Sequence, residues 1–178
     1  MLWSVLMAVA IAGESIPVTC EAVFIGPAGD CGLEGEWVAS GTAANENAAK
    51  KRAMARLLEA AELATAASAV QSAGSLAVVV AEQQRETCPT AVAELARVSC
   101  FPSLELATPQ TCFADFSADE CPTTQVIILE GIGFKTMEKV RQQICREVEQ
   151  TVQTAGLSEA EQLICRSRCL VESRVRCR

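Results

Sequence analysis

Histidine and tyrosine are both absent from this chain of 178 residues, and aromatic residues make up only 4% of it. Without histidine, the commonest general base of enzymes is missing, and so are Ser-His and Cys-His nucleophile pairs. The chain has no C-x-x-C sequence, which is the motif of thioredoxin-like redox centres. It also has no apolar run long enough to span a bilayer. These absences predict a non-enzymatic protein with no cofactor and no transmembrane segment.

Positive charge is missing from the start of the chain, since no Lys or Arg precedes Lys50. Met1–Ala12 is nevertheless a short apolar run that ends in an A-x-A sequence, as secretory signal peptides do. We therefore expect residues 1–12 to be a signal peptide and the protein to be periplasmic or secreted. The alternative is a buried apolar segment at the N-terminus.

Ten cysteines follow residue 12, an even number that predicts up to five disulfides in an exported protein. Zinc sites need closely spaced cysteine pairs or histidines, and the one close pair here is Cys165 and Cys169. The spacing therefore favours disulfides over a metal site. The candidates are Cys20, Cys31, Cys88, Cys100, Cys112, Cys121, Cys145, Cys165, Cys169 and Cys177.

Two parts of the chain resemble each other. Alignment of Cys31 with Cys121 matches further residues without a gap, namely Gly41 with Gly131, Arg56 with Arg146 and Glu59 with Glu149. Cys88 and Cys100 also have the same separation as Cys165 and Cys177. This similarity predicts an internal repeat, and the alternative is that two strand–glycine–helix segments match by chance.

The repeat divides the cysteines into two groups. Four belong to unit one, namely Cys20, Cys31, Cys88 and Cys100. Four belong to the equivalent places of unit two, namely Cys112, Cys121, Cys165 and Cys177. Cys145 and Cys169 remain, and they are expected to pair within unit two. The connectivity inside each group of four stays open.

In unit one, strands are expected at Val18–Ile25 and Leu33–Ser40, with Gly41 in a turn and Thr42 as a possible helix N-cap. A long helix then runs to about Ala67, and its charged face is interpreted as solvated. The Leu76–Arg85 segment is expected to be helical, and a short helix follows from Pro89 to about Arg97.

In unit two, the apolar Thr124–Glu130 strand is expected to be buried on both faces. A long helix follows and ends near Gly156. The S-x-x-E sequence of Ser158–Glu161 is a capping box that starts another helix to about Arg168. Leu170–Cys177 is the expected closing strand.

Together these elements predict an α+β protein of two similar small units with the order ββααβ, residues 13–107 and 108–178. Each unit would be an antiparallel sheet, formed by a β-hairpin and a closing strand, with helices on one face and disulfides as staples. The units are either separate or packed as one domain.

Charge is unevenly distributed in this chain of net charge −7, which is a poor ligand for nucleic acid. Its C-terminal part is basic, and the favoured interpretation is that its arginines cover the outer face of the last helix and strand. The alternative is that they dock to an acidic surface of an unknown protein or envelope component. They are Arg166, Arg168, Arg174, Arg176 and Arg178.

The sequence therefore favours an exported, disulfide-stabilised binding or structural module of unknown ligand. One alternative is a secreted inhibitor or effector, which would present a rigid exposed loop such as Gly26–Gly35. Another is a hydrolase that uses acidic residues such as Asp115, Asp119 and Glu120, which surround a turn in unit two.

Overall fold

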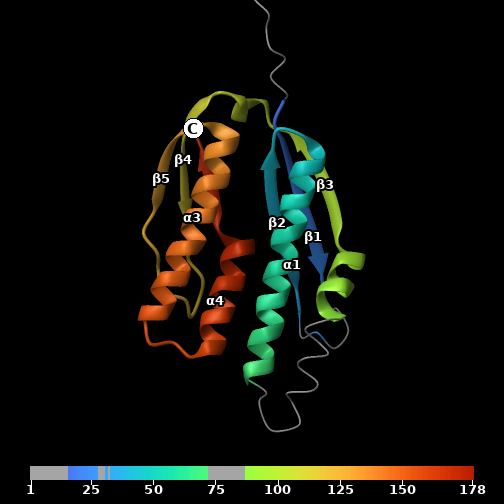
Figure 1. Cartoon of the computed structure of the whole chain (residues 1–178), viewed down its shortest axis with the longest axis vertical. Helices are drawn as coiled ribbons and strands as arrows, with labels where there is room; N and C mark the ends of the chain where they lie inside the picture. Colours follow the sequence, from blue (N-terminus) through green and yellow to red (C-terminus); the bar gives the residue numbers. More distant parts are fainter. Residues whose placement is uncertain (1–15, 28–30, 32, 72–86) are drawn as a thin grey trace, which may run out of the picture.

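The computed structural model describes residues 16–27, 31, 33–71 and 87–178 (Figure 1). The expected signal peptide at residues 1–12 and the expected helix at Leu76–Arg85 lie outside the described residues. Two three-stranded antiparallel sheets stand side by side, and helices cover one face of each. The predicted α+β architecture of two similar units is confirmed.

Unit one is built around its first strand, β1 (Val18–Ile25). That strand lies between β2 (Glu36–Ala43) and β3 (Arg97–Pro102), and both neighbours are antiparallel to it. The long helix α1 (Glu46–Gln71) packs across this sheet, and a shorter helix spans residues 87–95.

Unit two repeats this arrangement, with β4 (Pro109–Asp115) between β5 (Ile127–Ile132) and β6 (Arg174–Cys177). Helices α3 (Gly133–Thr154) and α4 (Glu159–Glu172) cover its sheet. The predicted capping box is present: Ser158 Oγ accepts from Glu161 N, and the Glu161 carboxylate accepts from Ser158 N at 2.7 Å. A 3₁₀ helix, η2 (Leu104–Ala107), joins the two units.

All ten cysteines form disulfides, and the bonds follow the division predicted from the repeat. Two of them join the central strand of each sheet to its closing strand, at equivalent places: Cys20–Cys100 and Cys112–Cys177. Two others are also equivalent: Cys31–Cys88 and Cys121–Cys165. The fifth, Cys145–Cys169, joins α3 to α4 and has no counterpart in unit one.

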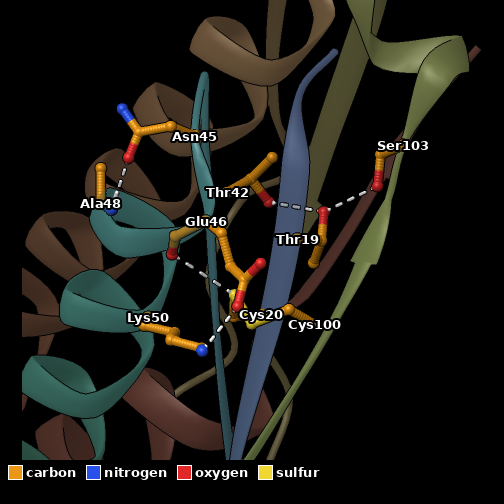
Figure 2. Close-up of a disulfide and its surroundings, with 9 residues drawn as sticks. All are labelled: Thr19, Cys20, Thr42, Asn45, Glu46, Ala48, Lys50, Cys100 and Ser103. Atoms are coloured by element: carbon orange, nitrogen blue, oxygen red, sulfur yellow. Dashed lines mark hydrogen bonds and ion pairs between the residues drawn. A yellow bond between two sulfur atoms is a disulfide. The ribbon is translucent and has the colours of Figure 1, made fainter. Parts of the chain in front are cut away.

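Gly41 lies inside β2 and not in the turn that we expected. A Cβ atom there would approach the backbone nitrogen of Ala53 to 2.5 Å and the backbone oxygen of Ala49 to 2.7 Å. Glycine is thus needed because α1 packs directly against β2, and not because of a turn conformation. The helix cap also differs: Asn45 Oδ1 accepts from Ala48 N at 2.9 Å, whereas Thr42 is buried in β2 (Figure 2).

A chain of buried hydroxyl groups crosses the sheet of unit one beside the Cys20–Cys100 disulfide (Figure 2). The Oγ1 atom of Thr19 lies 3.1 Å from that of Thr42 and 2.9 Å from Ser103 Oγ. Each hydroxyl can both donate and accept, so these groups satisfy one another away from water. Because β2 is an edge strand, Thr42 lies at the edge of the sheet that faces unit two.

The expectation that the apolar strand of unit two is buried on both faces is wrong. This strand, β5, lies at the edge of its sheet, and its residues alternate between half-buried and exposed. Ile128 and Ile132 keep 56% and 41% of their surface exposed. The closing strand β6 is also shorter than expected, because α4 continues to Glu172. In the described part of the chain, no helix combines the length and apolar character that a bilayer-spanning segment requires.

Candidate functional site: an arginine-lined cleft between the units

The two units meet where α1 lies beside α4 (Figure 1). Ser167 on α4 is buried, and its hydroxyl donates to the backbone oxygen of Ala60 on α1 at 2.8 Å. The contact lies on a face of α1 that is rich in alanine. Because alanine side chains are small, the two helix backbones can approach closely there. The junction is therefore a packed interface between helices of different units.

A buried cluster of three charged side chains lies at the same junction. Glu138 on α3 pairs with Arg56 on α1 at 2.5 Å and with Arg141 on its own helix at 2.8 Å. The side chains are only 8%, 12% and 9% exposed, respectively. Charges removed from water to this extent are stable only when they are paired and hydrogen-bonded. This cluster contains two arginines and one glutamate, so it carries one excess positive charge.

The cluster, together with Arg52, also covers the free edge of β2. The backbone nitrogen of Thr42 donates to Glu138 Oε1 at 2.9 Å. The backbone oxygens of Ser40 and Thr42 accept from Arg56 and Arg52, respectively. Backbone groups on an edge strand otherwise face solvent or attract another strand. Side chains from both units thus complete the hydrogen bonds of unit one's sheet.

The surroundings of the cluster shift two pKa values. Burial alone would raise the pKa of Glu138, but the hydrogen bond and charge of Arg56, the charge of Arg141 and the Thr42 N–H hold it below its ordinary value. Burial, together with the charge of Arg56, lowers the pKa of Arg141 to about 10. Both side chains are therefore charged at neutral pH.

Above this cluster a cleft of about 350 Å³ opens between α1 and α3, and the C-terminal half of α4 closes it. We refer to it as the junction cleft. Among the described residues, its lining contains five arginines against three glutamates, which leaves two excess positive charges. The arginines are Arg52, Arg56, Arg141, Arg146 and Arg166, and the glutamates are Glu59, Glu138 and Glu149. A chain of net charge −7 thus has a positive cleft at its centre.

The two long walls of the junction cleft are made of equivalent residues. Four lining positions of α1 match four lining positions of α3 in the alignment that places Cys31 on Cys121. The α1 residues Arg52, Ala55, Arg56 and Glu59 correspond to Gln142, Cys145, Arg146 and Glu149. The same face of the repeated helix therefore lines the cleft from both sides.

Covalent and ionic links hold the walls of the junction cleft together. Cys145 lines the cleft, and its disulfide to Cys169 ties α3 to α4. Arg166 on α4 pairs with Glu149 on α3 at 3.1 Å, with both side chains about two-fifths exposed. The disulfide restricts the movement of α3 relative to α4, whereas the exposed ion pair contributes little energy.

The five arginines considered as candidates for docking an acidic partner do not form one surface. Arg166 lines the junction cleft, whereas Arg168 pairs with Glu172 and donates to the backbone oxygen of Asp119. The remaining three alternate along the end of the chain and are exposed, namely Arg174, Arg176 and Arg178. The Arg178 guanidinium lies 4.8 Å from the centre of the Phe113 ring. Docking of a partner to this outer sheet face stays a prediction.

The other candidate residues lie outside the junction cleft. Asp115, Asp119 and Glu120 line neither the junction cleft nor the hollow between β2 and α4. Of the proposed inhibitory loop, Gly26 donates to Gly35 O at 2.8 Å, and residues 28–30 and 32 lie outside the described residues. The described residues contain no group of three or more potential metal ligands among His, Cys, Asp and Glu.

A second hollow, of about 470 Å³, lies between the start of β2 and α4. Its charged lining residues are three glutamates and one arginine, Glu34, Glu36, Glu172 and Arg168. The arginine is already paired with Glu172, and none of the four is buried. This hollow therefore lacks the buried, excess charge that distinguishes the junction cleft.

Apart from Arg166, sequence reasoning missed the charged residues of the junction cleft, and on the first long helix it did so because the charged face was interpreted as solvated. The Arg56 side chain is instead only 12% exposed at the junction, and Glu138 and Arg141 are buried. One signal was present in the alignment of the two units, where Arg56 matches Arg146 and Glu59 matches Glu149. Charged residues repeated at equivalent places of two units are candidates for a shared site.

The chain matches no family model, and it matches none of the curated proteins or solved structures with which it was compared. The geometry and charge of the junction cleft are therefore the basis of the functional assignment that follows.

Proposed function

We propose that this protein is a non-enzymatic binding module that acts outside the cytoplasm and holds its ligand in the junction cleft. Five disulfides indicate folding in an oxidising, extracytoplasmic compartment. The apolar run at residues 1–12 with its A-x-A end supports export through a signal peptide. The protein would then be periplasmic or secreted.

The observation that carries this proposal is a charged cleft with fixed walls. The Cys145–Cys169 disulfide ties two of its helices together, and the buried Arg56–Glu138 pair ties the third helix to them. A site held in its binding conformation loses less entropy on association, so more of the interaction energy appears as affinity. Such preorganisation is typical of binding proteins.

The ionisation of the cluster residues supports binding over proton-transfer catalysis. A general acid or base works best when its pKa lies near the working pH. The pKa of Glu138 is below its ordinary value and that of Arg141 is about 10, so neither exchanges a proton readily at neutral pH. Fixed charges of this kind attract and orient a ligand of opposite charge.

We also infer that the two units arose from an internal repeat. The same strand order and two pairs of disulfides at equivalent places support this inference. The matching walls of the junction cleft support it further, because the alignment that pairs the cysteines also pairs the lining residues.

Mass spectrometry of the protein recovered from the extracytoplasmic fraction tests the proposed function. Under native conditions we expect a chain lacking residues 1–12, with no thiol that can be alkylated before reduction, and a non-covalently bound molecule that denaturation releases. Recovery of the chain in the cytoplasm with free thiols would contradict the proposed compartment. A covalent adduct on a cleft side chain that turns over with added ligand would contradict the non-enzymatic role.

A further inference from the structure

We propose that the junction cleft binds a small organic oxyanion, whose carboxylate or phosphate group is held by Arg141, Arg146 and Arg166. This inference rests on the proposed function, because it names the ligand class of the same site. Carboxylate and phosphate share the chemistry that arginine recognises, namely oxygen atoms that accept two parallel N–H bonds from one guanidinium.

The first argument is the unbalanced charge at the base of the cleft. Glu138 is shared by Arg56 and Arg141, so the buried cluster keeps one positive charge without a carboxylate of its own. An uncompensated buried charge is costly, and a bound anion would neutralise it. Nearer the surface, Arg146 is exposed and has no ion pair among the described residues, although it lines the same cleft.

The second argument is that Arg141 lines the cleft and has N–H donors without a hydrogen-bond partner in the described part of the chain. A guanidinium carries five N–H donors, and within the described part of the chain only the Nη1 group of Arg141 is hydrogen-bonded, to Glu138. The one buried side-chain nitrogen or oxygen without a partner in that part is Gln110 Oε1. The other nitrogens of Arg141 are therefore not completely buried, and the side chain that carries them lines the cleft.

The size and shape of the cleft limit the class of ligand. Its volume of about 350 Å³ lies at the lower end of the range of small-molecule sites. Its positive groups lie at different depths, from the buried Arg141 through the partly exposed Arg166 to the exposed Arg146. This gradient suits a compact molecule with an acidic group at the base and further oxygens near the mouth.

Isothermal titration calorimetry with two probes, citrate and inorganic phosphate, tests the proposal at constant ionic strength. We expect saturable binding of at least one probe to the oxidised full-length protein. The probe that binds with the higher affinity identifies the preferred ligand group, which is carboxylate for citrate and phosphate for inorganic phosphate. Absence of saturable heat from both probes at millimolar concentration would overturn the proposal.

Three variants assign the binding to the cleft. Arg146→Gln removes one cleft arginine without disturbing the buried cluster, and it should weaken binding about ten-fold, as expected for a lost hydrogen bond to a charged group. Glu149→Gln removes a competing carboxylate and frees Arg166, so it should strengthen binding by roughly three-fold. Arg176→Gln changes the net charge of the protein by the same amount as Arg146→Gln. Arg176 lies on β6 and does not line the cleft, so this variant should bind like the wild type.

The pattern across these variants decides the outcome. Equal weakening by Arg146→Gln and Arg176→Gln would show a general charge effect and would overturn the assignment to the cleft. Unchanged binding in Arg146→Gln would overturn it as well. Thermal unfolding of each variant without probe shows whether it is folded. If the exported protein is oxidised and carries a ligand but neither probe binds, the proposed function survives and the oxyanion assignment fails.

Discussion

Replacement of Glu138 by glutamine is the most direct test of the buried cluster. Gln has nearly the same shape as Glu but no charge, so Glu138→Gln leaves Arg56 and Arg141 close together without a counter-ion. Removal of one partner of a buried ion pair destabilises a protein by about 3–5 kcal/mol. This is a large part of the ~5–15 kcal/mol that holds a typical domain folded.

Urea unfolding with the disulfides intact measures this loss at pH 7, and Glu59→Gln is the matched control. Glu59 lines the same cleft from α1, but it is exposed and outside the cluster. Its replacement should change the free energy of unfolding by no more than about 0.5 kcal/mol. If Glu138→Gln costs less than about 1 kcal/mol, the cluster does not stabilise the fold as its burial implies.

The same pair of proteins gives a pH dependence with a definite sign. The pKa of Glu138 is lower in the folded protein than its ordinary value of 4.5. The stabilisation by its charge is therefore fully present above the unfolded-state pKa and is lost as pH falls through the lower folded-state pKa. The difference in unfolding free energy between wild type and Glu138→Gln should shrink over this acid range. A difference that stays constant down to low pH would contradict the reasoning.

Three further changes test how the fold is built. Gly41→Ala should destabilise by about 1–3 kcal/mol in urea unfolding, because the new methyl group would overlap the Ala53 backbone. Joint replacement of Cys145 and Cys169 by serine opens a loop with a sequence separation of 24 residues and should cost about 3 kcal/mol in the same assay. Ser158→Ala removes the N-cap of α4 and should cost ~1 kcal/mol, with helix fraying visible by hydrogen exchange.

Much of the fold was predictable because its signals are local. The cysteine pattern divided the disulfides between the two units, although it left the connectivity within each group of four open. Val140, Ile144 and Val148 recur at helical spacing in the sequence, and all three are fully buried in the structure. The capping box fixed the start of α4. The edge position of β5 was not predictable in this way, since an apolar run does not show how many neighbours a strand has.

The junction cleft could not be predicted from local patterns. Arg56 and Glu138 are 82 positions apart, and each lies on a helix face that looks solvated when its own helix is considered alone. Their burial depends on how the two units pack, and the hydrophobic periodicity of a single helix carries no information about that packing. The repeat predicted which helices are equivalent, but it did not predict that their charged faces meet.

Three features that distinguish unit two from unit one lie at this cleft. In the alignment of the units, buried Glu138 corresponds to Ala48, and buried Arg141 corresponds to Lys51, which is exposed. The Cys145–Cys169 disulfide, which also has no counterpart in unit one, borders the same cleft. At this position, residues specific to unit two close the free edge of β2 and form the base of the junction cleft.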